Sequence, residues 1–293
     1  MTVISDLKEQ FRKGTNLLKL IYINSAVFIV MAVLQIIAVL ANKPGISSSV
    51  VEFLAVPASF SNLLLKPWTV ITYMFLHEGF FHVLFNMLWL YWFGRIFSDY
   101  FDQKKLVAVY ILGGLSGALF YILSFNIFPA FSETIHVSIA MGASASVMSI
   151  VVATAAYVPD YSVHLFLLGR VKIKYIAIGI FLLTSVFDFS VNTGGKIAHI
   201  GGAAFGIIYA LRFKQGKDTG KWITSIIDTI ATWFKPRKKM TVSYKKPMND
   251  LEYNKMKADH QEQINKILEK ISKGGYDSLT KAEKEILFKE GQK

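Results

Sequence analysis

The chain has 293 residues, of which 53% are hydrophobic, and a formal net charge of +12; its mean hydropathy is +0.41. This composition is too apolar for an ordinary soluble domain. The chain contains no cysteine, which excludes disulfides, thiol chemistry and thiolate-bound zinc.

The N-terminal segment through Lys19 is charged and has no short apolar region with a small-residue cleavage site, unlike a removable signal peptide. Six apolar stretches follow, each near the length of a spanning helix: residues 20–41, 80–98, 105–126, 141–158, 173–190 and 196–213. A count of five would merge or discard the last two. The segment Asp188–Lys196 between them is polar and glycine-rich, however, which is typical of a turn. We therefore predict an all-α membrane protein, a bundle of six transmembrane helices.

Cations are concentrated at alternate connections between these stretches. The N-terminal segment and the second and fourth connections carry most of them: Arg12, Lys13, Lys19, Arg95, Lys104, Lys105, Arg170, Lys172 and Lys174. The opposite connections carry only Lys43, Lys66 and Lys196. By the positive-inside rule both termini are cytoplasmic. Membrane topology therefore explains the basic charge, and we expect no nucleic-acid partner.

Four polar side chains lie near the start of stretches that run from outside to inside. His82 and Asn86 are one helical turn apart in the second stretch, Ser144 opens the fourth and His199 opens the sixth. At about 1.5 Å per residue, all four lie in the outer half of the membrane. Polar groups at such depth are costly and are functional candidates.

These residue types suit a hydrolase. A serine hydroxyl becomes a good nucleophile when a neutral imidazole accepts its proton, which gives Ser144 and His199 complementary roles. The oxyanion that forms needs donors, and the Asn86 amide and a His82 ring N–H are candidates. Backbone N–H groups of Ala143 and Ser144 at a helix N-terminus are others.

Glycines explain how these groups could meet. Gly142 flanks the serine, and Gly202 and Gly206 follow the histidine at a spacing that lets membrane helices pack closely. Gly113 and Gly117 have the same spacing in the third stretch and indicate packing alone.

Simpler explanations compete with each assignment. Ser146 and Ser149 share a helix with Ser144, and a membrane serine usually bonds a carbonyl one turn back. Only Ser144 has a glycine two positions earlier. Taken singly, His199 could be structural, and His82 and Asn86 could be interhelical polar contacts.

A metal site is not predicted. His77 and His82 are five residues apart, not the four of a zinc-binding helix, and no flanking acid completes a ligand set. His77 is expected to be structural. The nearest carboxylate to the serine and histidine is Asp188, which is typical of a cap, so a dyad is favoured over a triad.

Three segments together resemble a known family: His77-Glu78-Gly79-Phe80-Phe81-His82-Val83-Leu84-Phe85-Asn86, Gly142-Ala143-Ser144-Ala145 and Ala198-His199-Ile200-Gly201-Gly202. In this order, over roughly residues 15–213, the chain resembles rhomboid intramembrane serine proteases. The resemblance implies a Ser144–His199 dyad with His82 and Asn86 as oxyanion-hole donors. It also implies cleavage of transmembrane segments near their outer ends without metal or cofactor.

The same resemblance implies roles for other segments. Residues 42–79 would form a half-embedded loop, and the fifth helix with Asp188–Lys196 a gate and cap. Phe85 would close the site laterally. The chain departs from the family pattern at three positions: Ala145 replaces a usual glycine, Met148 a frequent tyrosine, and Thr69 a frequent arginine. A thioether can contact the catalytic ring in place of the tyrosine, and we expect altered loop anchoring at Thr69.

Beyond Arg212 the composition changes. Residues 221–234 place isoleucines on one helical face and are followed by a basic run, a pattern typical of a helix on an anionic membrane surface. Residues 253–273 have helical periodicity and end at Gly274-Gly275, and Thr280 with Glu283 forms a capping box for a second helix. We divide the chain into residues 1–19, 20–213, 214–250 and 251–293.

The first functional hypothesis is a serine endopeptidase of a bacterial plasma membrane whose partners are the lipid bilayer and transmembrane protein substrates. An alternative is a catalytically silent rhomboid-like protein that binds membrane clients. A transporter would need more polar residues at mid-membrane. A cytoplasmic partner for the tail, residues 251–293, is a further hypothesis.

Overall fold

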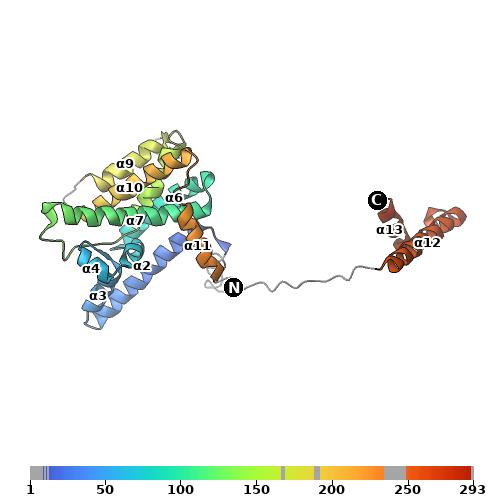
Figure 1. The fold of residues 1–293 in the computed structure, drawn as a ribbon, viewed down its shortest axis with the longest axis horizontal. Helices are drawn as coiled ribbons and strands as arrows, with labels where there is room; N and C mark the ends of the chain where they lie inside the picture. The colour runs from blue at the N-terminus through green and yellow to red at the C-terminus, as the bar shows by residue number, and fades with distance from the viewer. Residues whose placement is uncertain are drawn as a thin grey trace. The chain divides into compact units, whose positions relative to one another are not determined.

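Helices make up most of the chain (Figure 1). The computed structural model describes residues 9, 11, 13–165, 169–187, 192–233 and 249–291. The chain divides into two compact units, residues 1–235 and 236–293, which are described separately.

Six helices of the first unit occupy the six predicted stretches. They are α2 (Asn16–Leu40), α6 (Phe80–Tyr100), α7 (Gln103–Ile127), α8 (Ser144–Tyr157), α9 (Ile173–Ser185) and α10 (Thr193–Lys214). Most bounds differ from the predicted ones by a few residues, but α9 ends five residues early. The prediction of a cap at Asp188 lies outside the described residues.

Two of the described helices, α2 and α7, are long and apolar enough by themselves to cross a membrane. The apolar helices α8 and α9 are shorter. The 14 residues of α8 measure about 21 Å at 1.5 Å per residue, less than the roughly 30 Å of a hydrocarbon core. If α8 lies across a membrane, at least one of its ends must therefore lie inside.

Side-chain caps explain where several helices begin. The Thr15 hydroxyl accepts a bond from the backbone N–H of Leu18 at the start of α2, and Asp102 accepts two such bonds at the start of α7. Asn192 caps α10 from a left-handed backbone conformation, φ 51°. Each cap satisfies N–H groups that a helix leaves unpaired.

Helix α8 is the centre of this unit and packs against α6, α7, α9 and α10. Most of its residues are buried. Glycines permit the close approach, because a Cβ on Gly202 would lie 2.2 Å from the Ala145 carbonyl oxygen, and one on Gly206 2.5 Å from that of Ser149. Figure 1 shows α7, α9 and α10 gathered in this bundle.

The connection between α2 and α6 is folded into short elements. These are α3 (Gly45–Leu54), β1 (Val56–Pro57), α4 (Phe60–Leu65), α5 (Thr69–Thr72) and the 3-10 turn η1 (Tyr73–Phe75). A second 3-10 turn, η2 (Pro129–Phe131), follows α7.

Two small antiparallel sheets correct the all-α prediction. Strand β1 pairs with β2 (Ile139–Ala140), and β3 (Ser162–Leu165) pairs with β4 (Gly169–Lys172) between α8 and α9. The chain is therefore mostly helical. These strands of two to four residues are too short to produce a visible alternation in sequence.

The second unit is a helical hairpin of α12 (Asp250–Gly274), the 3-10 turn η3 (Tyr276–Ser278) and α13 (Lys281–Glu290). Ile264, Ile267 and Leu279 are buried in it. The predicted capping box of Thr280 and Glu283 is confirmed.

Candidate active site

Ser144 is the first residue of α8 and His199 lies in the second turn of α10. Both line the same narrow cavity, about 40 Å³ in volume. Asn86, Met148 and Thr184 are among the other residues that line it. The cavity can hold water but is far too small for a peptide segment. The fold therefore brings together three predicted site residues that are distant in sequence: Ser144, His199 and Asn86.

The imidazole of His199 is oriented by a neighbouring helix. Its Nδ1 lies 3.1 Å from the backbone carbonyl oxygen of Thr184 and 3.4 Å from the Ser185 hydroxyl. A carbonyl oxygen only accepts, so this contact places the proton on Nδ1 and leaves the lone pair on Nε2. Sequence reasoning missed Thr184. The only available signal was a pair of hydroxyl residues in an apolar stretch.

The turn before Ser144 is held by backbone hydrogen bonds. The Gly142 N–H donates to the Tyr73 carbonyl over 2.9 Å, and the Ala58 N–H donates to the Ser138 carbonyl over 3.0 Å. Because β2 lies between these bonds, the segment that leads to Ser144 is extended and fixed. Tyr73 was also missed, since a backbone carbonyl carries no residue-specific signal.

Gly142 has φ +139°, a conformation that residues with a Cβ rarely adopt. A Cβ there would lie 3.2 Å from His82 Nε2 and 3.4 Å from Ser144 Oγ. The histidine ring and the serine hydroxyl therefore border the same space. A side chain at this position would fill it.

Asn86 and His82 lie one turn apart on α6, as the sequence predicts. Asn86 is buried, and its Nδ2 donates to the His82 carbonyl over 2.9 Å. That bond uses one of the two amide hydrogens. The buried His77 ring packs edge-on against His82 at 5.2 Å between centroids.

The first turn of α8 begins at Ser144, and its N-cap residue Ala143 makes no side-chain capping bond. Backbone N–H groups of a first helical turn have no partner within the helix. They can therefore donate hydrogen bonds to an anion at this end of α8.

The neighbouring serines of α8 face another helix. Ser149 is fully buried, and its hydroxyl donates to the Val109 carbonyl over 2.9 Å. Ser146 is also fully buried, and its hydroxyl has no hydrogen-bond partner within the described residues. Its Oγ lies 2.5 Å from where a Cβ on Gly114 would be. Of the three serines, Ser144 is the one that lines the cavity.

The three departures from the family pattern have structural explanations. A Cβ on Gly117 would lie 2.5 Å from the Ala145 methyl, so the bare glycine makes room for that methyl. Met148 lines the cavity with His199. The Thr69 hydroxyl donates to the Lys66 carbonyl over 2.6 Å, which anchors the loop locally.

Phe85 is 52% exposed and stacks on Phe81 at 6.5 Å between ring centroids. It lies on the outward face of α6, one residue before Asn86. Across the described residues, no group of three histidine, aspartate or glutamate side chains is arranged to hold a metal ion.

Comparison with known proteins places this chain in a family. The model of the rhomboid domain matches residues 65–215, and a family of unknown function, DUF6576, matches residues 249–290. The chain is 27% identical over 161 residues to RHOMBOID-like protein 12, mitochondrial, of Arabidopsis thaliana, covering 51% of this chain and 47% of the relative. It is 28% identical over 157 residues to Rhomboid protease AarA of Providencia stuartii, covering 50% and 56%.

The rhomboid match covers just over half of the chain and includes α6 to α10 with every candidate site residue. The chain therefore belongs to the rhomboid family and is homologous to rhomboid proteases. Members of this family are integral membrane proteins, and so is this chain. It spans about half the length of the curated relatives it matches.

Proposed function

We propose that the chain is an intramembrane serine endopeptidase that cleaves transmembrane segments of other membrane proteins near the outer face. The observation that carries the proposal is that Ser144 and His199 line one cavity while His199 Nδ1 faces a carbonyl. This arrangement leaves Nε2 as the base for the hydroxyl. The relative whose name is Rhomboid protease AarA supports the same activity class.

In the proposed reaction, Ser144 Oγ forms a bond to the substrate carbonyl carbon and its proton passes to His199 Nε2. The charge that develops on the carbonyl oxygen is stabilised by the Asn86 amide, His82 and the backbone N–H groups of Ala143 and Ser144. Donors already in position act most strongly on charge that appears only in the transition state.

The intermediate then collapses. The carbon–nitrogen bond breaks, and the imidazolium gives its proton to the leaving amine. Water attacks the resulting acyl-enzyme with His199 again as base, which releases the second product and restores the Ser144 hydroxyl. The sequence of steps needs no metal or cofactor.

Substrate entry requires movement, because the cavity of about 40 Å³ cannot admit a peptide. We assign the gate to α9 and to Phe85 on α6. Thr184 belongs to α9 and also orients His199. Movement of α9 would therefore open the cavity and release the imidazole together.

For topology, we propose that α2 and α6 to α10 all span the membrane, with both termini cytoplasmic, in a bacterial plasma membrane. The alternating distribution of cations supports this orientation. The short α8 supports a nucleophile below the outer surface, because about 21 Å of helix leaves part of the membrane thickness uncovered.

The proposal is tested by reconstituting the purified chain with a helix-destabilised transmembrane substrate and measuring cleavage. Ser144→Ala and His199→Ala are each expected to lower the rate by about 10⁴-fold or more, as for other nucleophile and base deletions. Ser146→Ala is the matched control, since it removes a buried hydroxyl two residues away that faces α7.

Equal cleavage by the unaltered chain and both dyad variants would contradict the protease assignment. A silent client-binding protein would instead retain the substrate without cleaving it, in the unaltered chain and the variants alike.

The tail unit, residues 251–293, carries no part of this chemistry, and we propose that it binds a cytoplasmic partner. Deletion of residues 241–293 is expected to leave cleavage unchanged and to remove a cytoplasmic complex. A cytoplasmic complex that survives the deletion unchanged would contradict the tail assignment.

A further inference from the structure

A short amphipathic helix, α11 (Lys221–Trp233), follows α10 in the first unit. Its Ile223 is 7% exposed and packs against Ala108 and Leu112 of α7. On the same apolar side, Trp222 and Ile226 are 54% and 48% exposed. The helix therefore uses one part of its apolar face against the protein and leaves the other uncovered.

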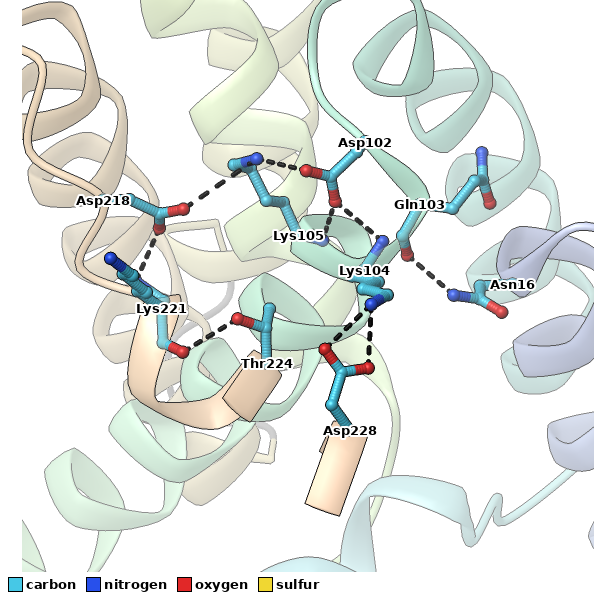
Figure 2. A network of polar contacts seen from close by, with 10 residues as sticks. Asn16, Asp102, Gln103, Lys104, Lys105, Asp218, Lys221, Thr224 and Asp228 are labelled. Carbon is cyan, nitrogen blue, oxygen red and sulfur yellow. Dashed lines mark hydrogen bonds and ion pairs between the residues drawn. The ribbon is translucent and has the colours of Figure 1, made fainter. Parts of the chain in front are cut away.

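Ion pairs set the orientation of α11 (Figure 2). Lys104 Nζ lies 2.8 Å from both carboxylate oxygens of Asp228, and Lys105 Nζ lies 3.9 Å from Asp218. The Asp218 carboxylate also accepts the Gly220 N–H over 2.9 Å, just before α11 begins. The exposed Lys104–Asp228 pair contributes little stability, but the two pairs fix which side of α11 turns toward the start of α7.

The depth of the contact follows from the residues that α11 touches. Ala108 and Leu112 lie one and two turns beyond Lys104, about 6 and 12 Å further along the axis of α7. Since α7 is apolar and long enough to span the membrane, α11 lies beside its first membrane turns. Interfacial helices bury their apolar face at a similar depth, roughly 5–10 Å below the headgroups.

Basic residues precede and follow this helix in the sequence. Exposed lysines precede or open it: Lys214, Lys217 and Lys221. The sequence adds a basic run after it, Lys235, Arg237, Lys238 and Lys239, which lies outside the described residues. Basic clusters beside a membrane surface attract anionic lipid headgroups, so the charge complements the inner leaflet.

We infer that α11 is a membrane-binding interfacial helix that recognises an anionic lipid surface. The Ile223 side is fixed to α7, and the edge formed by Trp222 and Ile226 enters the boundary between headgroups and acyl chains. Exposed lysines bind the headgroups: Lys214, Lys217 and Lys221. This inference does not depend on proteolysis, because a catalytically inactive chain would bind lipid in the same way.

The absence of cysteine permits a direct test with single spin labels on the full chain. Labels are attached at Ile226→Cys and, as the matched control, at Ser225→Cys, an adjacent exposed residue on the polar side. The protein is reconstituted in vesicles of phosphatidylcholine, with and without phosphatidylglycerol. Accessibility to oxygen, which concentrates in lipid, is compared with accessibility to a water-soluble nickel chelate.

The label at 226 is expected to be reached by oxygen and shielded from nickel, most strongly with phosphatidylglycerol, and the label at 225 to show the reverse. Equal nickel access at both positions would overturn the inference. Identical results in the two lipid compositions would overturn the anionic part of it. Dipolar coupling between labels at 226 of two chains would identify a second copy as the occupant and would likewise overturn it.

A charge exchange tests the orienting pair. Asp228→Lys is expected to increase the mobility of the label at 226, and the double variant Lys104→Asp, Asp228→Lys to restore it. If the double variant is as mobile as the single one, the pair does not orient α11. Cleavage activity, measured in parallel, should stay the same in all variants, which separates this result from any failure of the proposed function.

Discussion

The imidazole of His199 is positioned by a backbone carbonyl, that of Thr184, in the described part of the chain. A carbonyl fixes the tautomer as a carboxylate would, but it carries no full charge to stabilise the imidazolium of the proposed reaction. In the proposed mechanism, stabilisation of the oxyanion must therefore supply a large share of the rate enhancement. At the scale of single residues, the proposed rate enhancement therefore depends mainly on the hydrogen-bond donors around Ser144.

Asn86→Ala tests the contribution of one of these donors. Its amide would act on charge that appears in the transition state, so kcat should fall roughly 10²–10³-fold with little change in KM, as for other oxyanion-hole donors. The measurement is steady-state cleavage in proteoliposomes.

Asn24→Ala is the matched control for Asn86, because Asn24 is a buried amide whose bonds go to Leu20 and Tyr110. It should reduce stability and leave the kcat of the folded fraction unchanged. If Asn86→Ala keeps the original kcat, the amide has only a structural role.

At the scale of elements, the site depends on how closely α8 and α10 approach. Gly202→Ala would place a methyl 2.2 Å from the Ala145 carbonyl oxygen, so the helices must separate. We expect a loss of about 1–3 kcal/mol of stability, as for other overpacked interfaces. Activity should also fall, because Ser144 and His199 lie on the two helices that separate. Thermal unfolding in detergent and cleavage rates measure both effects.

Gly179→Ala is the control for Gly202, since no heavy atom lies within 4 Å of a Cβ there. In the middle of α9 this change should be neutral or stabilising by about 0.5–1 kcal/mol. Equal behaviour of the two variants would show that the helices do not need the bare glycine.

The α12–α13 hairpin offers a prediction on pH. The pKa of Glu283 is lowered from its ordinary value of 4.5 to about 2 by the Thr280 backbone N–H and then by the Lys270 ammonium. A carboxyl group with a lowered pKa stabilises the fold above its unfolded pKa and loses that contribution as pH falls. Helicity of the isolated segment 249–293, measured by circular dichroism, should therefore decline between about pH 4.5 and 2.

Glu283→Gln should flatten the decline in that window, while Glu252→Gln, in the first turn of α12, should not. The change is expected to be modest, because the group is exposed and solvent screens its interactions. A decline that is the same in both variants would assign the pH dependence to other carboxylates.

At the scale of the whole molecule, the helices were predictable because long apolar stretches separated by charged turns leave little alternative. Ser144, His199 and Asn86 could be grouped from the sequence for two reasons. Polar side chains are costly inside a membrane, and the predicted topology assigns these three to the same depth. The contacts that the sequence did not predict are made by the backbone. The Thr184 carbonyl orients His199, and the Tyr73 carbonyl holds the turn before Ser144. Every residue has a backbone carbonyl, so the sequence does not indicate which ones make such contacts.

The pairing of β1 with β2 was unpredictable for a related reason. Two residues per strand give no periodic signal, and their register depends on contacts between the loop after α2 and the loop after α7. The same pairing explains why α8 begins at Ser144, three residues later than the predicted stretch, since the preceding segment is held extended.

We propose that α8 and α10, brought together from distant parts of the chain, make Ser144 a nucleophile that depends on His199. Labelling with a fluorophosphonate, followed by mass spectrometry of the intact chain and its peptides, tests this most directly. We expect one phosphonyl adduct, on Ser144, that persists in Ser146→Ala and disappears in His199→Ala. An adduct on Ser146, no adduct in the unaltered chain, or undiminished labelling of His199→Ala would contradict it.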